Sequence, residues 1–173
     1  MSWRRRNILL WMIVLAVCLA VPPWNSSFCG DLPTTVIIVR HAEKSAPTGN
    51  IPLSEAGFER AQTLARVVSG AAISAIYTSK LLRTVQTAEP TARLLGLVPQ
   101  QINEVGALAK NILDGHAGQT VLVVHHSDTL PELILALGAS TKPIIRDDEF
   151  DKLFVVTVYA PHKANVMILR YGK

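Results

Sequence analysis

The sequence predicts one α/β domain, a three-layer sandwich with a mostly parallel central sheet flanked by helices. Three observations lead to this fold class. The β-branched run Thr35-Val-Ile-Ile-Val39 is continuous, as in strands buried on both faces. Further short apolar runs alternate along the chain with segments of helical periodicity, which favours parallel strands joined by helices. The length of 173 residues suits one domain with a substantial core.

The first half of the domain is expected to contain two strands and two helices. A strand at 35–39 precedes a helix over 54–68, because Ser54 is a good N-cap and apolar residues then recur on one face. A short strand at 75–78 precedes a helix over 81–95. Pro90 should kink or break this second helix, because proline lacks an N–H and clashes with the preceding turn.

The second half should complete the sheet. Its expected elements are a weak strand at 100–102, a helix over 105–113, a strand at 120–124, a helix over 129–138 and two late strands at 153–159 and 165–171. Thr129 and Glu132 have the spacing of a capping box at the start of the last helix. Ligands of open α/β sheets bind beyond the carboxyl ends of the strands, so the residues that follow each strand are the first candidates for a site.

The N-terminus has the pattern of a targeting segment. Arg4–Arg6 precede the unbroken apolar run 8–21, which is typical of a secretory signal and shorter than the roughly 20 residues of a membrane span. We therefore expect a signal peptide or N-terminal membrane anchor over 1–21, a linker over 22–33 and the functional domain over 34–173. The domain would be exported to the periplasm or another extracytoplasmic compartment. An uncleaved segment would attach it to the inner membrane.

The charge of the chain does not indicate a nucleic-acid partner. The formal net charge is +4, and the N-terminal arginine triplet supplies most of the excess. The sequence shows no basic patch interleaved with aromatic residues and no nucleic-acid-binding motif. Cys18 lies inside the apolar run, so a cleaved product would keep only Cys29 and could form no internal disulfide.

Basic side chains gather at three predicted strand ends. Arg40 and His41 follow the first strand, Arg83 lies one turn into the helix after the second, and His125 and His126 follow the strand at 120–124. Guanidinium groups bind phosphoryl oxygens through two hydrogen bonds, and a histidine can donate a proton, accept one or attack phosphorus. These residues therefore predict a phosphate pocket at one edge of the sheet.

Four segments together resemble the histidine phosphatase (phosphoglycerate mutase-like) superfamily. They occur in the family's order, and the resemblance spans residues 35–171. The segments are Val39-Arg-His-Ala-Glu-Lys44, Leu53-Ser-Glu-Ala-Gly57, Tyr77-Thr-Ser-Lys-Leu-Leu-Arg-Thr-Val-Gln-Thr87 and Val124-His-His-Ser-Asp-Thr129. The resemblance implies a small bacterial exported member of the family with a phosphoglycerate mutase-like fold.

The resemblance also implies roles for individual residues. His41 would be the nucleophile that forms a phosphohistidine, and Arg40 and Arg83 would bind the phosphoryl group. His126 would be the second histidine of the pocket, whereas His125 takes a place that is usually glycine. The implied activity is hydrolysis of a phosphomonoester without a metal ion or another cofactor.

The resemblance leaves the proton donor for the leaving group open among three carboxylates. Glu104 is the first choice, because Ile102-Asn-Glu104 is similar to the family's context for this acid. Glu104 could equally favour the start of the following helix through the helix dipole. Glu43, two residues after His41, and Asp128 are the alternatives.

The sequence restricts the substrate only by the small size of its variable segments. The loops at 45–52 and 142–151 are short, which fits an open pocket for a small phosphorylated compound, a phosphorylated surface glycan or a phosphoryl-protein. One alternative function is a non-catalytic phospholigand-binding domain or a membrane-tethered partner protein. A second alternative is a metal-dependent hydrolase. It is disfavoured because adjacent strand residues such as His125 and His126 point to opposite faces.

Overall fold

The computed structural model describes residues 32–160 and 163–172. The expected signal or anchor segment at 1–21, and all but the last two residues of the linker, lie outside the described residues. Within the described part of the chain, no helix is both long and apolar enough to cross a membrane.

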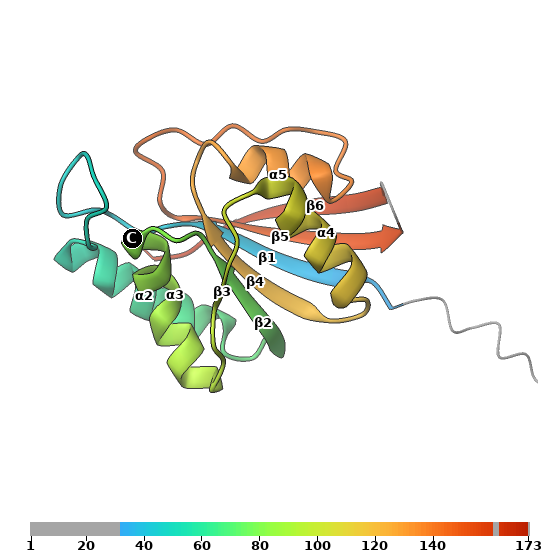
Figure 1. Ribbon diagram of the computed structural model, residues 1–173, viewed down its shortest axis with the longest axis horizontal. Coiled ribbons are helices and arrows are strands. Elements are labelled where there is room, and N and C mark those ends of the chain that lie inside the picture. Colours follow the sequence, from blue (N-terminus) through green and yellow to red (C-terminus); the bar gives the residue numbers. More distant parts are fainter. Residues whose placement is uncertain (1–31, 161–162, 173) are drawn as a thin grey trace, which may run out of the picture. The chain divides into compact units, whose positions relative to one another are not determined.

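A six-stranded sheet forms the centre of the domain, in the order β3-β2-β4-β1-β5-β6 (Figure 1). The strands are β1 (Thr34–Arg40), β2 (Ile73–Thr78), β3 (Gln100–Gln101), β4 (Thr120–His125), β5 (Lys152–Ala160) and β6 (Lys163–Arg170). The pairs β2–β3, β2–β4 and β1–β4 are parallel, and the pairs β1–β5 and β5–β6 are antiparallel. The predicted, mostly parallel sheet is therefore confirmed.

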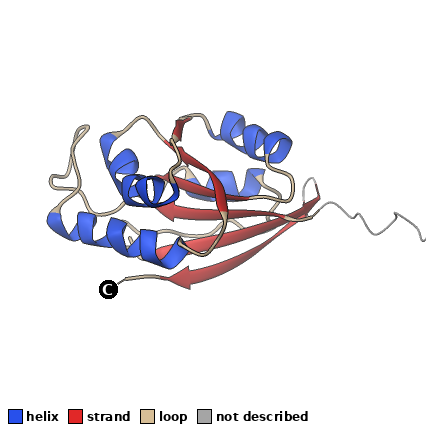
Figure 2. Cartoon of the chain, turned by 90° about the horizontal axis from the view of Figure 1, so that it is seen from below, coloured by secondary structure: helices blue, strands red, loops and turns tan. Residues whose placement is uncertain are grey.

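Helices pack on both faces of this sheet (Figure 2). They are α2 (Glu55–Val68), α3 (Leu82–Leu95), α4 (Val105–Gly115) and α5 (Leu130–Ala136). Apolar residues of α2 and α3 share one core with one face of the strands, and those of α4 and α5 share a second core with the other face. Each inner strand thus contributes to two cores, which explains its continuous apolar sequence.

Two local expectations need correction. Pro90 does not break α3, which continues from Leu82 to Leu95. A proline removes one backbone hydrogen bond, and the buried residues on both sides of it, Thr87 to Ala88 and Thr91 to Ala92, hold the helix against the sheet. Thr129 occupies the N-cap position of α5, but its side chain makes no capping bond there.

Strand register brings the predicted site segments together. Arg40 pairs with His125 across β1 and β4, and the next backbone N–H, that of His41, donates to the carbonyl of His125 at 2.9 Å. Thr78 at the end of β2 pairs with Val124 on the other side of β4. Three parallel strands therefore end at the same edge, with the basic residues in the loops that follow them.

Candidate active site

His41 lies buried directly after β1, with one ring nitrogen already bonded. Its Nδ1 is 2.7 Å from the carbonyl oxygen of Ala42. A carbonyl can only accept, so Nδ1 carries the proton and the neutral ring keeps its lone pair on Nε2. Burial lowers the pKa of His41 to about 4, and the charges of Arg83 and Arg40 act in the same direction. His41 is therefore an unprotonated imidazole at neutral pH, as an attacking nucleophile must be.

His126 lies beside His41. The two ring centroids are 5.4 Å apart, and His126 Nε2 is 2.9 Å from the hydroxyl oxygen of Ser79. Burial lowers the pKa of His126 to about 3, with further lowering by His125 and Arg83. His126 is thus neutral before a ligand binds, and the Ser79 hydroxyl at the end of β2 fixes its ring.

Arg40 is held by the segment 146–150. Its Nη1 donates to the carbonyl oxygens of Arg146, Asp147 and Glu149 at 3.0, 2.9 and 3.3 Å. The guanidinium carbon lies 4.2 Å from the ring centroid of Phe150, within the range of a cation–π contact. Burial lowers the pKa of Arg40, although a guanidinium stays charged at neutral pH.

Arg83 completes the basic group from the first turn of α3. Its Nη1 approaches the Gly49 carbonyl only at 3.5 Å. Its positive charge lowers the pKa of Arg40, His41 and His126. The pKa of Arg83 itself is lowered by burial and raised by Asp128.

Three buried nitrogen atoms of this group have no hydrogen-bond partner among the described residues. They are Nε of Arg40, Nε of Arg83 and Nδ1 of His126. Buried polar atoms are nearly always paired in folded proteins. A phosphoryl group, with several acceptor oxygens and negative charge, suits this set of basic side chains around a neutral imidazole.

The loop after His41 is fixed by close packing against the start of α2. A Cβ on Gly57 would lie 2.3 Å from the Glu43 carbonyl oxygen, so only glycine allows this approach. The backbone N–H of Ser54 donates to the same carbonyl oxygen at 2.9 Å. On the other side, the Thr87 hydroxyl accepts from the Ala42 N–H at 2.9 Å. These contacts explain why the segments 53–57 and 77–87 accompany the Arg-His pair.

A comparison with protein families agrees with this geometry. Residues 36–105 match the family model described as "Histidine phosphatase superfamily (branch 1)". Over this segment the chain resembles the histidine phosphatase superfamily. The matched segment contains Arg40, His41 and Arg83, and His126 lies beyond it. A search of curated proteins found no match.

Solved structures show the same fold. The protein histidine phosphatase SixA complexed with tungstate has a TM-score of 0.62 at 22% identity, covering 79% of this chain and 95% of that chain. An Escherichia coli K-12 protein, a suggested alpha-ribazole-5'-P phosphatase, has a TM-score of 0.65 at 18% identity, with coverages of 79% and 96%. A mycobacterial glucosyl-3-phosphoglycerate phosphatase has a TM-score of 0.63 at 13% identity, with coverages of 81% and 100%.

The three predicted acids have different surroundings. Glu104 is exposed at the N-cap of α4, where its carboxylate accepts from the Ala107 N–H at 3.1 Å. The carboxylate of Glu43 forms a close ion pair with Arg60 at 2.7 Å. Asp128 makes no side-chain hydrogen bond to a described residue, and its charge raises the pKa of Arg40, Arg83 and both adjacent histidines.

His125 is buried and points away from His41. Its Nε2 is 3.2 Å from the Ile102 carbonyl oxygen and must donate to it, so Nδ1 accepts from the Thr129 hydroxyl at 2.6 Å. Both ring nitrogens are therefore engaged, and they join the end of β4 to the segment after β3. His125 therefore packs inside the domain, and only 2% of the residue is exposed.

Sequence reasoning missed the residues that support these side chains. Ser79 and Thr87 both lie in the segment 77–87 that resembles the family. Their small hydroxyl side chains are the feature of the sequence that could have pointed to them. Glu149 and Phe150 follow no periodic pattern. They lie in the loop 142–151, whose sequence indicates only a short variable segment. Among the described residues, no group of three or more His, Cys, Asp or Glu side chains could hold a metal ion.

Proposed function

We propose that this protein is a phosphatase that hydrolyses a phosphomonoester or a phosphoryl-protein through a phosphohistidine on His41, without a metal ion. The family match and the shared fold support a phosphatase. The observation that carries the finer proposal is the neutral, buried His41, with its Nε2 lone pair free of the Ala42 contact and basic groups around it.

The reaction follows from these positions. Nε2 of His41 attacks phosphorus, and the bond from phosphorus to the leaving oxygen breaks with its electron pair on that oxygen. Arg40, Arg83 and His126 offset the charge on the three remaining phosphoryl oxygens, so the protein contributes mainly positioning and electrostatics. Water then attacks the phosphohistidine, which releases inorganic phosphate and restores neutral His41.

An acid must protonate the leaving oxygen in the first step. Glu104, Glu43 and Asp128 are the three choices, and their surroundings favour different outcomes. Glu104 and Glu43 already have structural partners at a helix end and in an ion pair. Asp128 raises the pKa of Arg40, Arg83 and His126 and has no hydrogen-bond partner among the described residues, which supports Asp128 as the donor over the first choice from the sequence.

Leaving-group dependence separates the three acids. Asp128→Asn, Glu104→Gln and Glu43→Gln would be compared on an alkyl phosphate and on p-nitrophenyl phosphate. Loss of the true donor should lower kcat by about 10²-fold or more on the alkyl ester, whose leaving oxygen needs a proton, and much less on the nitrophenyl ester. Equal losses on both esters would identify a residue as structural.

The substrate proposed is a small phosphorylated compound, a phosphorylated surface glycan or a phosphoryl-protein, met outside the cytoplasm. Export is proposed from the sequence pattern of residues 1–21, and membrane attachment from the uncleaved form of the same segment. Cell fractionation, with N-terminal sequencing of the mature chain, tests both. A chain found intact in the cytosol would contradict them.

The decisive test of the activity is a panel of phosphorylated compounds assayed with wild type and His41→Ala. Wild type should turn over at least one class, and quenching during turnover should trap an acid-labile phosphoryl group on His41. Activity of His41→Ala at the wild-type level would exclude His41 as the nucleophile. Phosphate binding by wild type without any turnover would favour the phospholigand-binding alternative instead.

A further inference from the structure

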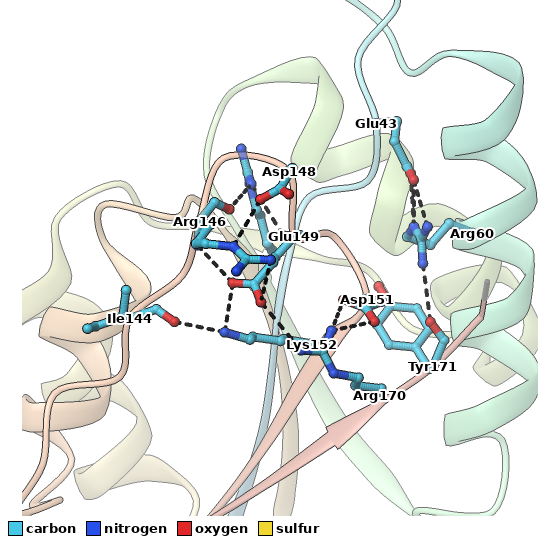
Figure 3. A network of polar contacts seen from close by, with 11 residues as sticks. Glu43, Arg60, Ile144, Arg146, Asp148, Glu149, Asp151, Lys152, Arg170 and Tyr171 are labelled. Atoms are coloured by element: carbon cyan, nitrogen blue, oxygen red, sulfur yellow. Dashed lines mark hydrogen bonds and ion pairs between the residues drawn. The ribbon is translucent and has the colours of Figure 1, made fainter.

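The turn before β5 supports Arg40 through one buried carboxylate, that of Glu149. Figure 3 shows Glu149 at the centre of a network of polar contacts. Its Oε2 accepts from the backbone N–H of Arg146 at 2.9 Å, and its own N–H donates to the carbonyl of Arg146 at 3.1 Å. The two bonds run in opposite directions across the same four residues. They close the turn from both ends, as a capping box closes a helix start.

Two strands hold this carboxylate from the sheet side. Lys152 of β5 donates to Glu149 Oε2 at 2.7 Å and to the Ile144 carbonyl at 2.8 Å. Arg170 of β6 lies 3.4 Å from Glu149 Oε1 and also binds the carboxylate of Asp151 at 2.7 and 2.8 Å. The hydrogen bonds from Lys152 and from the Arg146 N–H lower the pKa of Glu149 to about 2, so the group is ionised at any physiological pH.

The closed turn contacts Arg40 of the candidate active site. The carbonyl oxygens of Arg146, Asp147 and Glu149 all accept from one nitrogen, Nη1 of Arg40. The following residue, Phe150, places its ring 4.2 Å from the Arg40 guanidinium carbon and 6.1 Å from the His41 ring centroid. An arginine side chain has many rotamers, and bidentate phosphate binding requires one orientation of its planar group.

We propose that Glu149 is a positioning residue for phosphoryl binding, acting through the turn 146–150 that orients Arg40. The inference rests on the proposed function, because it assigns Arg40 to the phosphoryl group. Glu149 does not touch that group. Its carboxylate fixes the three carbonyl oxygens and the aromatic ring against which the guanidinium is oriented.

The test measures binding of inorganic phosphate by calorimetry, together with thermal unfolding and the separate values of kcat and KM. Glu149→Gln keeps the size of the side chain and removes its charge. It should weaken phosphate binding about tenfold, the effect of one charge-assisted hydrogen bond. Asp148→Asn is the matched control, since Asp148 lies in the same turn, is exposed and bonds only to Arg146. The control should bind phosphate within about twofold of wild type.

A double-mutant cycle separates positioning from general damage to the fold. In an Arg40→Lys background, Glu149→Gln should change phosphate affinity by less than about twofold, because the guanidinium that Glu149 helps to orient is already absent. Equal losses in both backgrounds would overturn the inference. Wild-type affinity in a folded Glu149→Gln single variant would overturn it too.

A second variant covers the case in which Glu149→Gln does not fold. Lys152→Gln leaves the Glu149 carboxylate in place and removes the ion pair between that carboxylate and the Lys152 ammonium. It should weaken phosphate binding about threefold in the wild-type background. An unchanged affinity in this folded variant would contradict the inference. A wild-type protein that binds no phosphate would overturn the proposed function, and this inference with it.

Discussion

The low pKa of His41 predicts a specific loss of stability in acid. The pKa is about 4 in the folded protein and 6.5 for an ordinary histidine. Because the folded value is the lower one, the unfolded chain takes up a proton first as the pH falls. The stabilising contribution is complete above pH 6.5 and is lost progressively toward pH 4. At about pH 5 the difference of about 1.5 pH units corresponds to about 2 kcal/mol.

His41→Gln removes this titration and leaves that of His126. Urea unfolding followed by circular dichroism at about pH 7.5 and about pH 5 gives the free energy of unfolding of both proteins. Wild type should lose about 2 kcal/mol more than His41→Gln between the two conditions. The kcat/KM of wild type should show no acid limb near pH 6.5 arising from His41. Equal acid losses of stability in the two proteins would refute the low pKa, and with it the neutral nucleophile.

Four further variants test the site. His126→Ala should lower kcat by about 10²-fold or more because it removes a charge-stabilising group, whereas His125→Gly should lower the melting temperature and keep most turnover of p-nitrophenyl phosphate. The opposite ranking would show that the two histidines have exchanged roles. Arg83→Lys should weaken phosphate binding about tenfold in calorimetry, since an ammonium cannot form the bidentate fork. Gly57→Ala should destabilise the fold by about 1–3 kcal/mol in urea unfolding, because its Cβ would meet the Glu43 carbonyl oxygen.

The sequence was sufficient for the sheet because each strand has a simple physical signature. β1 and β4 are buried on both faces, so their apolar runs are continuous, and such runs can be recognised without a structure. The rule that ligands bind at the carboxyl ends of parallel strands then brings Arg40, His41 and His126 together. The helix does not break at Pro90 because helix propensity is a local rule, whereas packing of α3 against the sheet decides whether the helix continues.

The supporting contacts could not be predicted because they join residues that are distant in sequence and have no shared pattern. Glu149 is more than a hundred residues from Arg40, and the contact is made through backbone carbonyls, which any residue carries. The Thr129 hydroxyl bonds to the His125 ring and to the backbone of His126, and it does not cap α5. Nothing in the spacing of the residues predicts these partners.

The same charges explain both phosphate affinity and the reactivity of the nucleophile. Arg83 lowers the pKa of His41 and of His126 in the site without ligand, and Arg40 lowers that of His41. A phosphoryl dianion between these groups offsets the guanidinium charges, so its arrival must raise both histidine pKa values. By linkage, a proton on His126 must in turn strengthen phosphate binding, while a proton on His41 would block attack. The site therefore works best where His126 can take up a proton with the substrate and His41 cannot. Burial, Arg83 and Arg40 keep His41 neutral although its Nδ1–H bond to the Ala42 carbonyl raises its pKa, and the same bond leaves the lone pair on Nε2.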